Sequence, residues 1–159
     1  MIVDLDFLHK HACWLIIDPW LKQPENDIKV CPDIEDRNAK IVLKISEYLR
    51  NCKHWLVSTY TNDIAIPFQD LENIKGNQEI LTQYMKNNDL DVIVYTGFHD
   101  GLCVFHQEFV GAKYMRQFYK CYLQKDLICY APELFIDTTP DKVPQVLYDL
   151  SYENDIPYI

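Results

Sequence analysis

A cysteine and an aspartate stand where two apolar segments of the sequence end. Asp18 closes the apolar run ACWLIID. Cys103 follows a second apolar run, 92–96, after a turn that begins at Gly97. A thiol becomes a nucleophile when a nearby base takes its proton, and a carboxylate can act as that base. The pair therefore indicates thiol-based acyl chemistry, provided that the fold brings the two side chains together.

The order of apolar and amphipathic segments predicts how the two residues are positioned. Short apolar runs typical of buried strands occur at 12–18, 55–59, 92–96, 120–123 and 127–130. Patterns typical of helices occur at 34–52, 78–86, 103–118 and 143–150. Alternating strands and helices predict an α/β fold, a three-layer α-β-α sandwich with a mostly parallel, Rossmann-like sheet, as one domain over residues 1–159.

In such a sheet, ligands bind beyond the carboxyl ends of the strands, near a switch in strand order. Asp18 and the turn from Gly97 to Cys103 both follow predicted strands. If those two strands are neighbours, the carboxylate and the thiol face one crevice.

Composition excludes several classes of function. The chain has 24 acidic and 15 basic residues and a net charge of −9, which repels nucleic acid and anionic membrane surfaces. The six cysteines form no C-x-x-C pair and the five histidines do not cluster with them, so we expect no metal site and a reducing, cytoplasmic setting. A phosphate-binding loop is disfavoured because the chain has only four glycines and no G-x-G-x-x-G pattern.

The segment DVIVYTGFHDGLCV, residues 91–104, resembles the signature of the isochorismatase-like cysteine hydrolases. In that signature an apolar strand leads to Thr-Gly, a loop, and Cys-Val at the start of a helix, and here Cys103 follows Gly97 by six residues. The run ending at Asp18 resembles the opening strand of the family, and Gly111 and Ala112 match its small residues after the cysteine. The resemblance covers roughly residues 12–137.

The resemblance implies a homo-oligomeric enzyme that hydrolyses small amides or related compounds without a cofactor, through a Cys-Asp-Lys triad. Cys103 would be the nucleophile and Asp18 its base, with backbone N–H groups around Leu102 and Cys103 binding the oxyanion. The lysine departs from the pattern, because Asp70 stands at its aligned position and only Lys75 could replace it.

The short connection 60–76 is a second departure, because it lacks the Asp-x-His pattern of relatives that bind a metal. Aromatic residues at or after strand ends could instead form the walls of a substrate pocket. Together with two residues of the turn before the cysteine, the candidate substrate-binding residues are Trp20, Tyr60, Phe68, His99 and Leu102.

Each assignment has a plainer alternative. Cys103 could be a core thiol, Asp18 a capping or ion-paired acid, and Lys75 a solvated loop lysine. His106, three residues after Cys103, could face the same side or be a structural histidine. The sequence therefore predicts a metal-independent cysteine hydrolase acting through a thioester, or alternatively a catalytically inactive binding or assembly protein with the same fold.

Overall fold

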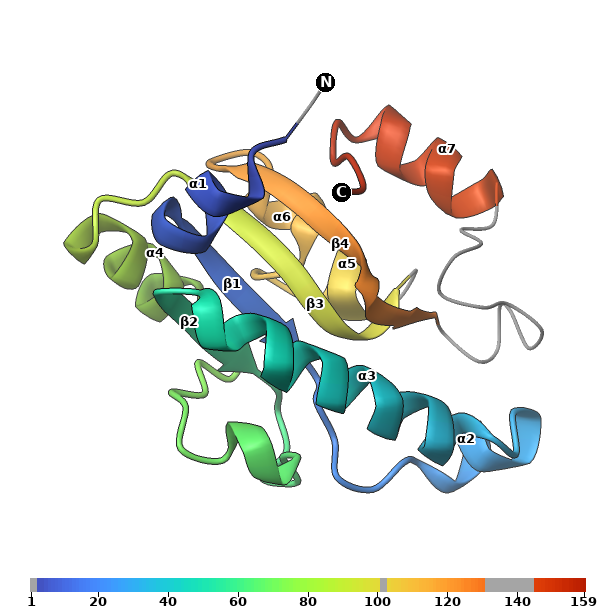
Figure 1. Ribbon diagram of the computed structural model, residues 1–159. Helices are drawn as coiled ribbons and strands as arrows, with labels where there is room; N and C mark the ends of the chain where they lie inside the picture. Colours follow the sequence, from blue (N-terminus) through green and yellow to red (C-terminus); the bar gives the residue numbers. More distant parts are fainter. Residues whose placement is uncertain (1–2, 101–102, 131–144) are drawn as a thin grey trace.

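The sheet of this protein is four-stranded and entirely parallel. The structure, a computed structural model, describes residues 3–100, 103–130 and 145–159. The strands are β1 (Ala12–Ile17), β2 (His54–Ser58), β3 (Val92–Asp100) and β4 (Lys120–Tyr130), in the order β2-β1-β3-β4 (Figure 1). The chain leaves β1 toward one neighbour, β2, and later returns to the other side as β3. The switch in strand order therefore lies at β1, which has β2 on one side and β3 on the other.

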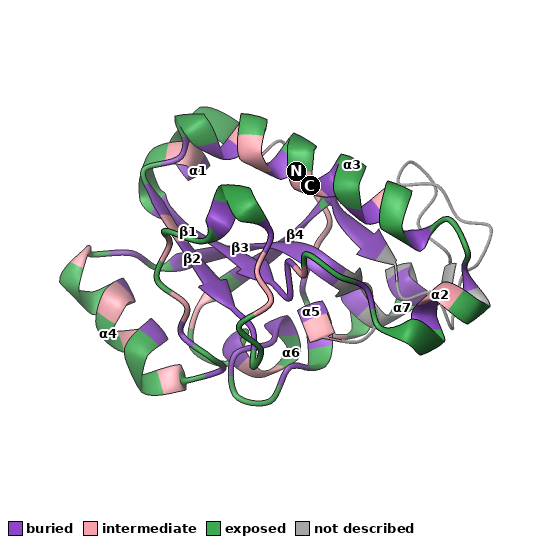
Figure 2. Cartoon of the chain, turned by 90° about the horizontal axis from the view of Figure 1, so that it is seen from below, coloured by how far each residue is buried: buried purple, intermediate pink, exposed green. Residues whose placement is uncertain are grey.

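Helices cover both faces of this sheet, with the sheet as the middle layer (Figure 2). One face carries α1 (Leu5–His11) and α3 (Ile34–Tyr48), and the other carries α4 (Gln78–Asn87), α5 (Cys103–His106) and α6 (Ala112–Met115). The remaining elements are α2 (Glu25–Val30), α7 (Gln145–Glu153) and two 3₁₀ turns, Leu49–Asn51 and Ile66–Phe68. The predicted three-layer α-β-α sandwich is confirmed.

The central strand β1 is apolar at every position because it is buried on both faces. Trp14 and Ile16 pack on the side of α1 and α3, whereas Leu15 and Ile17 pack on the side of α4, α5 and α6. All four side chains are fully buried. A continuous apolar run, rather than an alternating one, is the sequence pattern of a strand in such a position.

The prediction of one helix over 103–118 was wrong, because the chain turns between α5 and α6. Phe109 has a φ of 69° within this turn. A Cβ atom at Gly111 would lie 2.6 Å from the backbone N of Gln107 and 2.7 Å from the backbone O of Phe105. The glycine therefore permits a tight reversal that the apolar pattern hid, since Phe105 and Met115 are buried in the same cluster.

Three other boundaries differ from the sequence expectation. The runs 120–123 and 127–130 belong to one strand, β4, in which Leu123 pairs with Tyr95 but Ile128 pairs with Gly97, so the register shifts between them. Residues 25–30, expected as a loop, form α2, and residues 5–11 form α1. Both helices are short and have acidic residues in the first turn, a local signal that the apolar pattern does not contain.

Candidate functional site

Asp18 and Cys103 meet at the carboxyl ends of β1 and β3. Asp18 is the first residue after β1 and Cys103 is the first residue of α5, which follows β3. The Cys103 thiol donates a hydrogen bond to the carboxylate of Asp18. Two groups that are 85 positions apart in the sequence are thus in direct contact.

The backbone around Asp18 is fixed by both neighbouring strands. Asp18 has a φ of 46°, and its N–H donates to the carbonyl oxygen of Ser58 at the end of β2, with 3.1 Å between N and O. On the other side, Ile17 pairs with Gly97 of β3. A Cβ atom at Gly97 would lie 2.2 Å from the carbonyl oxygen of Ile17, so only glycine lets the strands approach here. The approach brings the turn that carries Cys103 toward Asp18.

Burial dominates the electrostatics of Asp18. The side chain is 4% exposed, and the loss of hydration raises its pKa above the ordinary value, while hydrogen bonds from Cys103 and Thr59 act in the opposite direction. A carboxylate with a raised pKa is a stronger base and is therefore better suited to take a proton from a thiol. Thr59 in turn accepts a hydrogen bond from the Trp20 indole, with 3.2 Å between Nε1 and Oγ1.

A second polar pair, Ser58 and Gln107, holds α5 to the end of β2. The Ser58 hydroxyl donates to Oε1 of Gln107 over 2.5 Å, and Nε2 of Gln107 donates to the Ser58 carbonyl oxygen over 3.4 Å. The Gln107 N–H also donates to the Cys103 carbonyl oxygen, with 2.9 Å between N and O. Both side chains are buried. Since the Ser58 carbonyl also binds the Asp18 N–H, this pair connects the backbones of both candidate catalytic residues.

The sequence analysis missed Ser58 and Gln107. Ser58 follows three apolar residues of β2 at the position level with Ile17, and Gln107 comes four residues after Cys103. Polar residues at buried strand ends and just after a short helix are common, so only their mutual contact distinguishes them. That contact depends on strand order and could not be read from the sequence.

The side chain of Lys75 is not among the described groups that act on the Asp18 carboxylate. Its side chain is exposed, its φ is 49°, and its N–H donates to Oδ1 of Asn73 over 3.0 Å. The described groups that act on the pKa of Asp18 are Cys103 and Thr59, and Lys75 is not among them. The next residue, Gly76, donates its N–H to the hydroxyl of Ser58. The turn at Lys75 thus contacts the site through its backbone.

The aromatic candidates are placed differently from one another. Tyr60 is 61% exposed, and its pKa is raised by partial burial and then by the charges of Glu108, Asp18 and Cys103, so its phenol lies beside the site. Trp20 is half-buried and contacts Thr59. Phe68 is instead a core residue: it is fully buried and packs edge-on against Trp55, with 6.3 Å between ring centroids. The structure does not place Phe68 on a pocket wall.

Two further candidates cannot be placed. Leu102 lies outside the described residues, and so does the side chain of His99.

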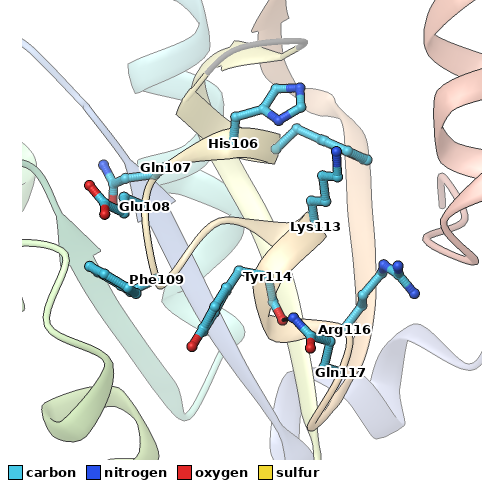
Figure 3. A pocket seen from close by; sticks show the side chains of 9 residues that line it. His106, Gln107, Glu108, Phe109, Lys113, Tyr114, Arg116 and Gln117 are labelled. Atoms are coloured by element: carbon cyan, nitrogen blue, oxygen red, sulfur yellow. Dashed lines mark hydrogen bonds between the residues drawn. The ribbon is translucent and has the colours of Figure 1, made fainter.

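His106 is exposed and lines a cavity of about 470 Å³ whose lining includes Phe109, Lys113 and Tyr114 but neither Cys103 nor Asp18 (Figure 3). Partial burial and the neighbouring charge of Lys113 lower the pKa of His106.

Two searches over the described residues bear on metals and membranes. In residues 3–100, 103–130 and 145–159, no three histidine, cysteine, aspartate or glutamate side chains are grouped as metal ligands. Over the same ranges, no helix combines the length and the apolar character that crossing a bilayer requires.

Comparisons with known proteins identify the fold. No protein-family model and no curated protein matches the sequence. The structure is similar to YcaC from Escherichia coli, described as an octameric hydrolase of unknown specificity, with a TM-score of 0.59 and 12% identity over 99% of this chain and 76% of that one. It is also similar to YcaC from Pseudomonas aeruginosa, solved with hexane-2,5-diol and covalent acrylamide, with a TM-score of 0.56 and 10% identity over 99% and 77%. The chain therefore has the α/β fold of the YcaC proteins, which agrees at the level of fold with the resemblance seen in the sequence.

Proposed function

We propose that this protein is a cysteine hydrolase of the isochorismatase-like type that acts on a small amide, ester or related carbonyl compound. The observation that carries the proposal is the hydrogen bond from the Cys103 thiol to the buried carboxylate of Asp18. The fold shared with a protein described as a hydrolase supports it, as does the description of a second protein of this fold as holding covalent acrylamide. The single domain, the cytoplasmic location and the homo-oligomer stay predictions, the last supported by the octameric relative.

The reaction follows from the two side chains. Asp18 takes the thiol proton of Cys103, and the sulfur forms a bond to the substrate carbonyl carbon. The tetrahedral intermediate collapses, the bond to the leaving amine or alcohol breaks, and the leaving group receives the proton from Asp18. Water then attacks the thioester while Asp18 accepts a proton from it, and the acid and the free thiol are released. This course needs no metal.

The missing lysine contact favours a second candidate function. In the family pattern an ammonium group stabilises the thiolate, whereas here the side chain of Lys75 is exposed and does not act on Asp18. A protein with this arrangement could use the crevice to bind a ligand or to assemble without catalysis. That alternative predicts ordinary thiol reactivity for Cys103.

Alkylation by iodoacetamide across pH separates the two candidates. Cys103 is the one cysteine of the six that is not buried, and burial raises the pKa of Cys13, Cys52, Cys121 and Cys129 to about 12. Labelling of the folded protein, located by peptide mass spectrometry, should therefore report Cys103.

We expect labelling of wild type to persist at a pH where an ordinary thiol is protonated, and Asp18→Asn to lose that reactivity. Equal pH profiles for wild type and Asp18→Asn would contradict the enzyme and favour the inactive protein. Hydrolysis of a broad panel of small amides and esters by wild type and Cys103→Ala is the direct test, and activity that survives Cys103→Ala would place the chemistry elsewhere.

A further inference from the structure

The cavity that His106 lines is built on the turn between α5 and α6, and contacts to the core fix that turn. The Gly111 N–H donates to the carbonyl oxygen of Gln107, with 2.8 Å between N and O. The hydroxyl of Tyr95, a fully buried residue of β3, donates to the carbonyl oxygen of Val110 over 2.7 Å. The backbone that frames the cavity is therefore tied to the sheet.

Three side chains on one side of this cavity carry hydrogen-bond donors on nitrogen: His106, Lys113 and Arg116 (Figure 3). Lys113 extends from α6 toward His106, and the imidazole packs edge-on against the buried ring of Phe105, with 5.0 Å between ring centroids. Arg116 follows Lys113 by three residues, the spacing of neighbours on one face of a helical turn. The three groups thus present two positive charges and an imidazole to the same space.

An acidic group does not balance these charges within the described part of the lining. Partial burial and then the charge of Lys113 lower the pKa of His106, and no carboxylate is among the described groups that act on it. The one acid that the structure describes in the lining is Glu108, which lies away from Lys113 in Figure 3. Its charge, after partial burial, raises the pKa of Tyr60 instead. Positive groups that gather without a counter-charge favour a bound anion.

The donors suit a phosphate group better than other small ions. A phosphate monoester carries a charge close to −2 at neutral pH and has three terminal oxygens. The guanidinium of Arg116 matches two of these oxygens, the ammonium of Lys113 supplies a second charge, and the neutral imidazole of His106 donates one N–H. A carboxylate brings only one negative charge against two positive ones, and a cation would be repelled.

The opposite side of the cavity is aromatic. Phe109 and Tyr114 both line it and pack edge-on, with 5.7 Å between ring centroids. Phe109 is 47% exposed, so much of its ring is accessible to a ligand. An apolar group attached to the phosphate would gain free energy by covering these rings, which inorganic phosphate cannot do.

We propose that this cavity is a binding site for a small organic phosphate. His106, Lys113 and Arg116 hold the phosphate, and the organic group covers the two aromatic rings. Neither Asp18 nor Cys103 lines the cavity, so its occupation does not depend on the proposed hydrolase activity.

Binding can be followed by NMR of the His106 imidazole in the full-length ¹⁵N-labelled protein, with the signals assigned by comparison with His106→Gln. The probe is phenyl phosphate, titrated at neutral pH and low salt so that exposed charges are not screened. We expect saturable shifts and a rise in the pKa of His106, because the bound anion offsets the charge of Lys113. Phenyl phosphate should bind about tenfold more tightly than benzoate and severalfold more tightly than inorganic phosphate.

Variants assign the binding to the basic side chains. Lys113→Gln and Arg116→Gln should each weaken phenyl phosphate binding by about tenfold, since each removes a charge-assisted hydrogen bond. Lys40→Gln is the matched control, because Lys40 is an exposed residue of α3 that does not line this cavity and its replacement changes the net charge equally. Lys113 and Arg116 are exposed as well, so these variants are expected to fold.

Three results would overturn the proposal. The first is an absence of saturable shifts of the His106 signals with phenyl phosphate. The second is equal binding of phenyl phosphate and inorganic phosphate, which would mean that the aromatic side of the cavity is not used. The third is binding that survives the combined Lys113→Gln and Arg116→Gln changes, or that Lys40→Gln weakens as much as they do.

Discussion

Gln107 and Asn38 are both buried amide side chains, and of the two Gln107 is linked to Asp18, through Ser58. Gln107 is 5% exposed, and its amide oxygen and nitrogen both bind Ser58. Asn38 is 1% exposed, and neither amide atom has a partner among the described residues. The amide of Gln107 thus has a hydrogen-bond partner for each polar atom, whereas the amide of Asn38 has none among the described residues.

The difference teaches that burial alone does not tell what a polar side chain does. A satisfied amide such as Gln107 joins two elements, here α5 and β2, and its loss leaves other groups without partners. An unsatisfied amide such as Asn38 lowers the stability of the protein, because its polar atoms lose their hydration without gaining a partner. Replacing each amide with leucine, which is similar in size, should therefore change stability in opposite directions.

The largest effect is expected at Gln107. Gln107→Leu leaves the Ser58 hydroxyl without its acceptor in a buried position and should lower the free energy of unfolding by about 1–3 kcal/mol. Chemical denaturation measures this change, and Gln117→Leu, at an exposed position, is the control. The thiol should also lose the Asp18-dependent part of its alkylation rate. If Gln107→Leu were as stable as wild type, the expected difference between Gln107 and Asn38 would be contradicted.

A double-mutant cycle tests whether the lost stability comes from the hydrogen bonds between Ser58 and Gln107. Ser58→Ala and Gln107→Leu each remove one member, so the double variant should be less destabilised than the sum of the two single variants, by about 1–2 kcal/mol. Thermal or urea unfolding of the four proteins gives the coupling energy. Strict additivity would mean that the hydrogen bonds between the two side chains contribute nothing beyond their separate packing.

Asn38→Leu should have a smaller effect and the opposite sign. We expect a gain of about 1 kcal/mol in the free energy of unfolding, because the variant no longer buries unpaired polar atoms and leucine is the better helix former. Asn26→Leu, on the exposed surface of α2, estimates the part of this gain that comes from helix propensity. A marked loss of stability in Asn38→Leu would show that its amide already has a partner within the chain.

The smallest expected effect is the change in the free energy of unfolding with pH that comes from Asp18. It is small because two hydrogen bonds to the charged form of Asp18 offset part of the cost of burying it. The pKa of folded Asp18 lies above its ordinary value of 3.8. Below pH 3.8 the carboxyl group is neutral in both the folded and the unfolded state, so its burial costs little. As the pH rises through the folded pKa, the native state must bury a charge, so stability is lost. Unfolding of wild type and Asp18→Asn from acid to neutral pH should show this loss only in wild type, and parallel curves would contradict it.

Much of the fold was predictable from local pattern. Buried parallel strands are apolar throughout, so the segments of β1, β2 and β3 could be recognised, and Asp18 and Cys103 could be placed at strand ends. The approach of the two residues depended on β1 and β3 being neighbours, a condition that the sequence left open and that the strand order fulfils.

The rest could not be predicted because it depends on contacts between distant segments. The break between α5 and α6 depends on how closely Gly111 approaches Gln107, which no periodicity reports. Phe68 and Tyr60 are both aromatic residues after β2, yet one is fully buried and the other is 61% exposed. The missing partners of Asn38 are a property of the folded packing and leave no trace in the sequence.

Both outer edges of the sheet are already engaged by the chain itself. Residues 72–74 bond to Val57 of β2, and residues 157–159 bond to Leu123 and Lys125 of β4. Open strand edges are the usual template for sheet extension between molecules. Here, a neighbouring copy could add a strand at these positions only by first displacing the segment that covers them. An assembly of several copies would therefore not extend the sheet through these stretches of its edges.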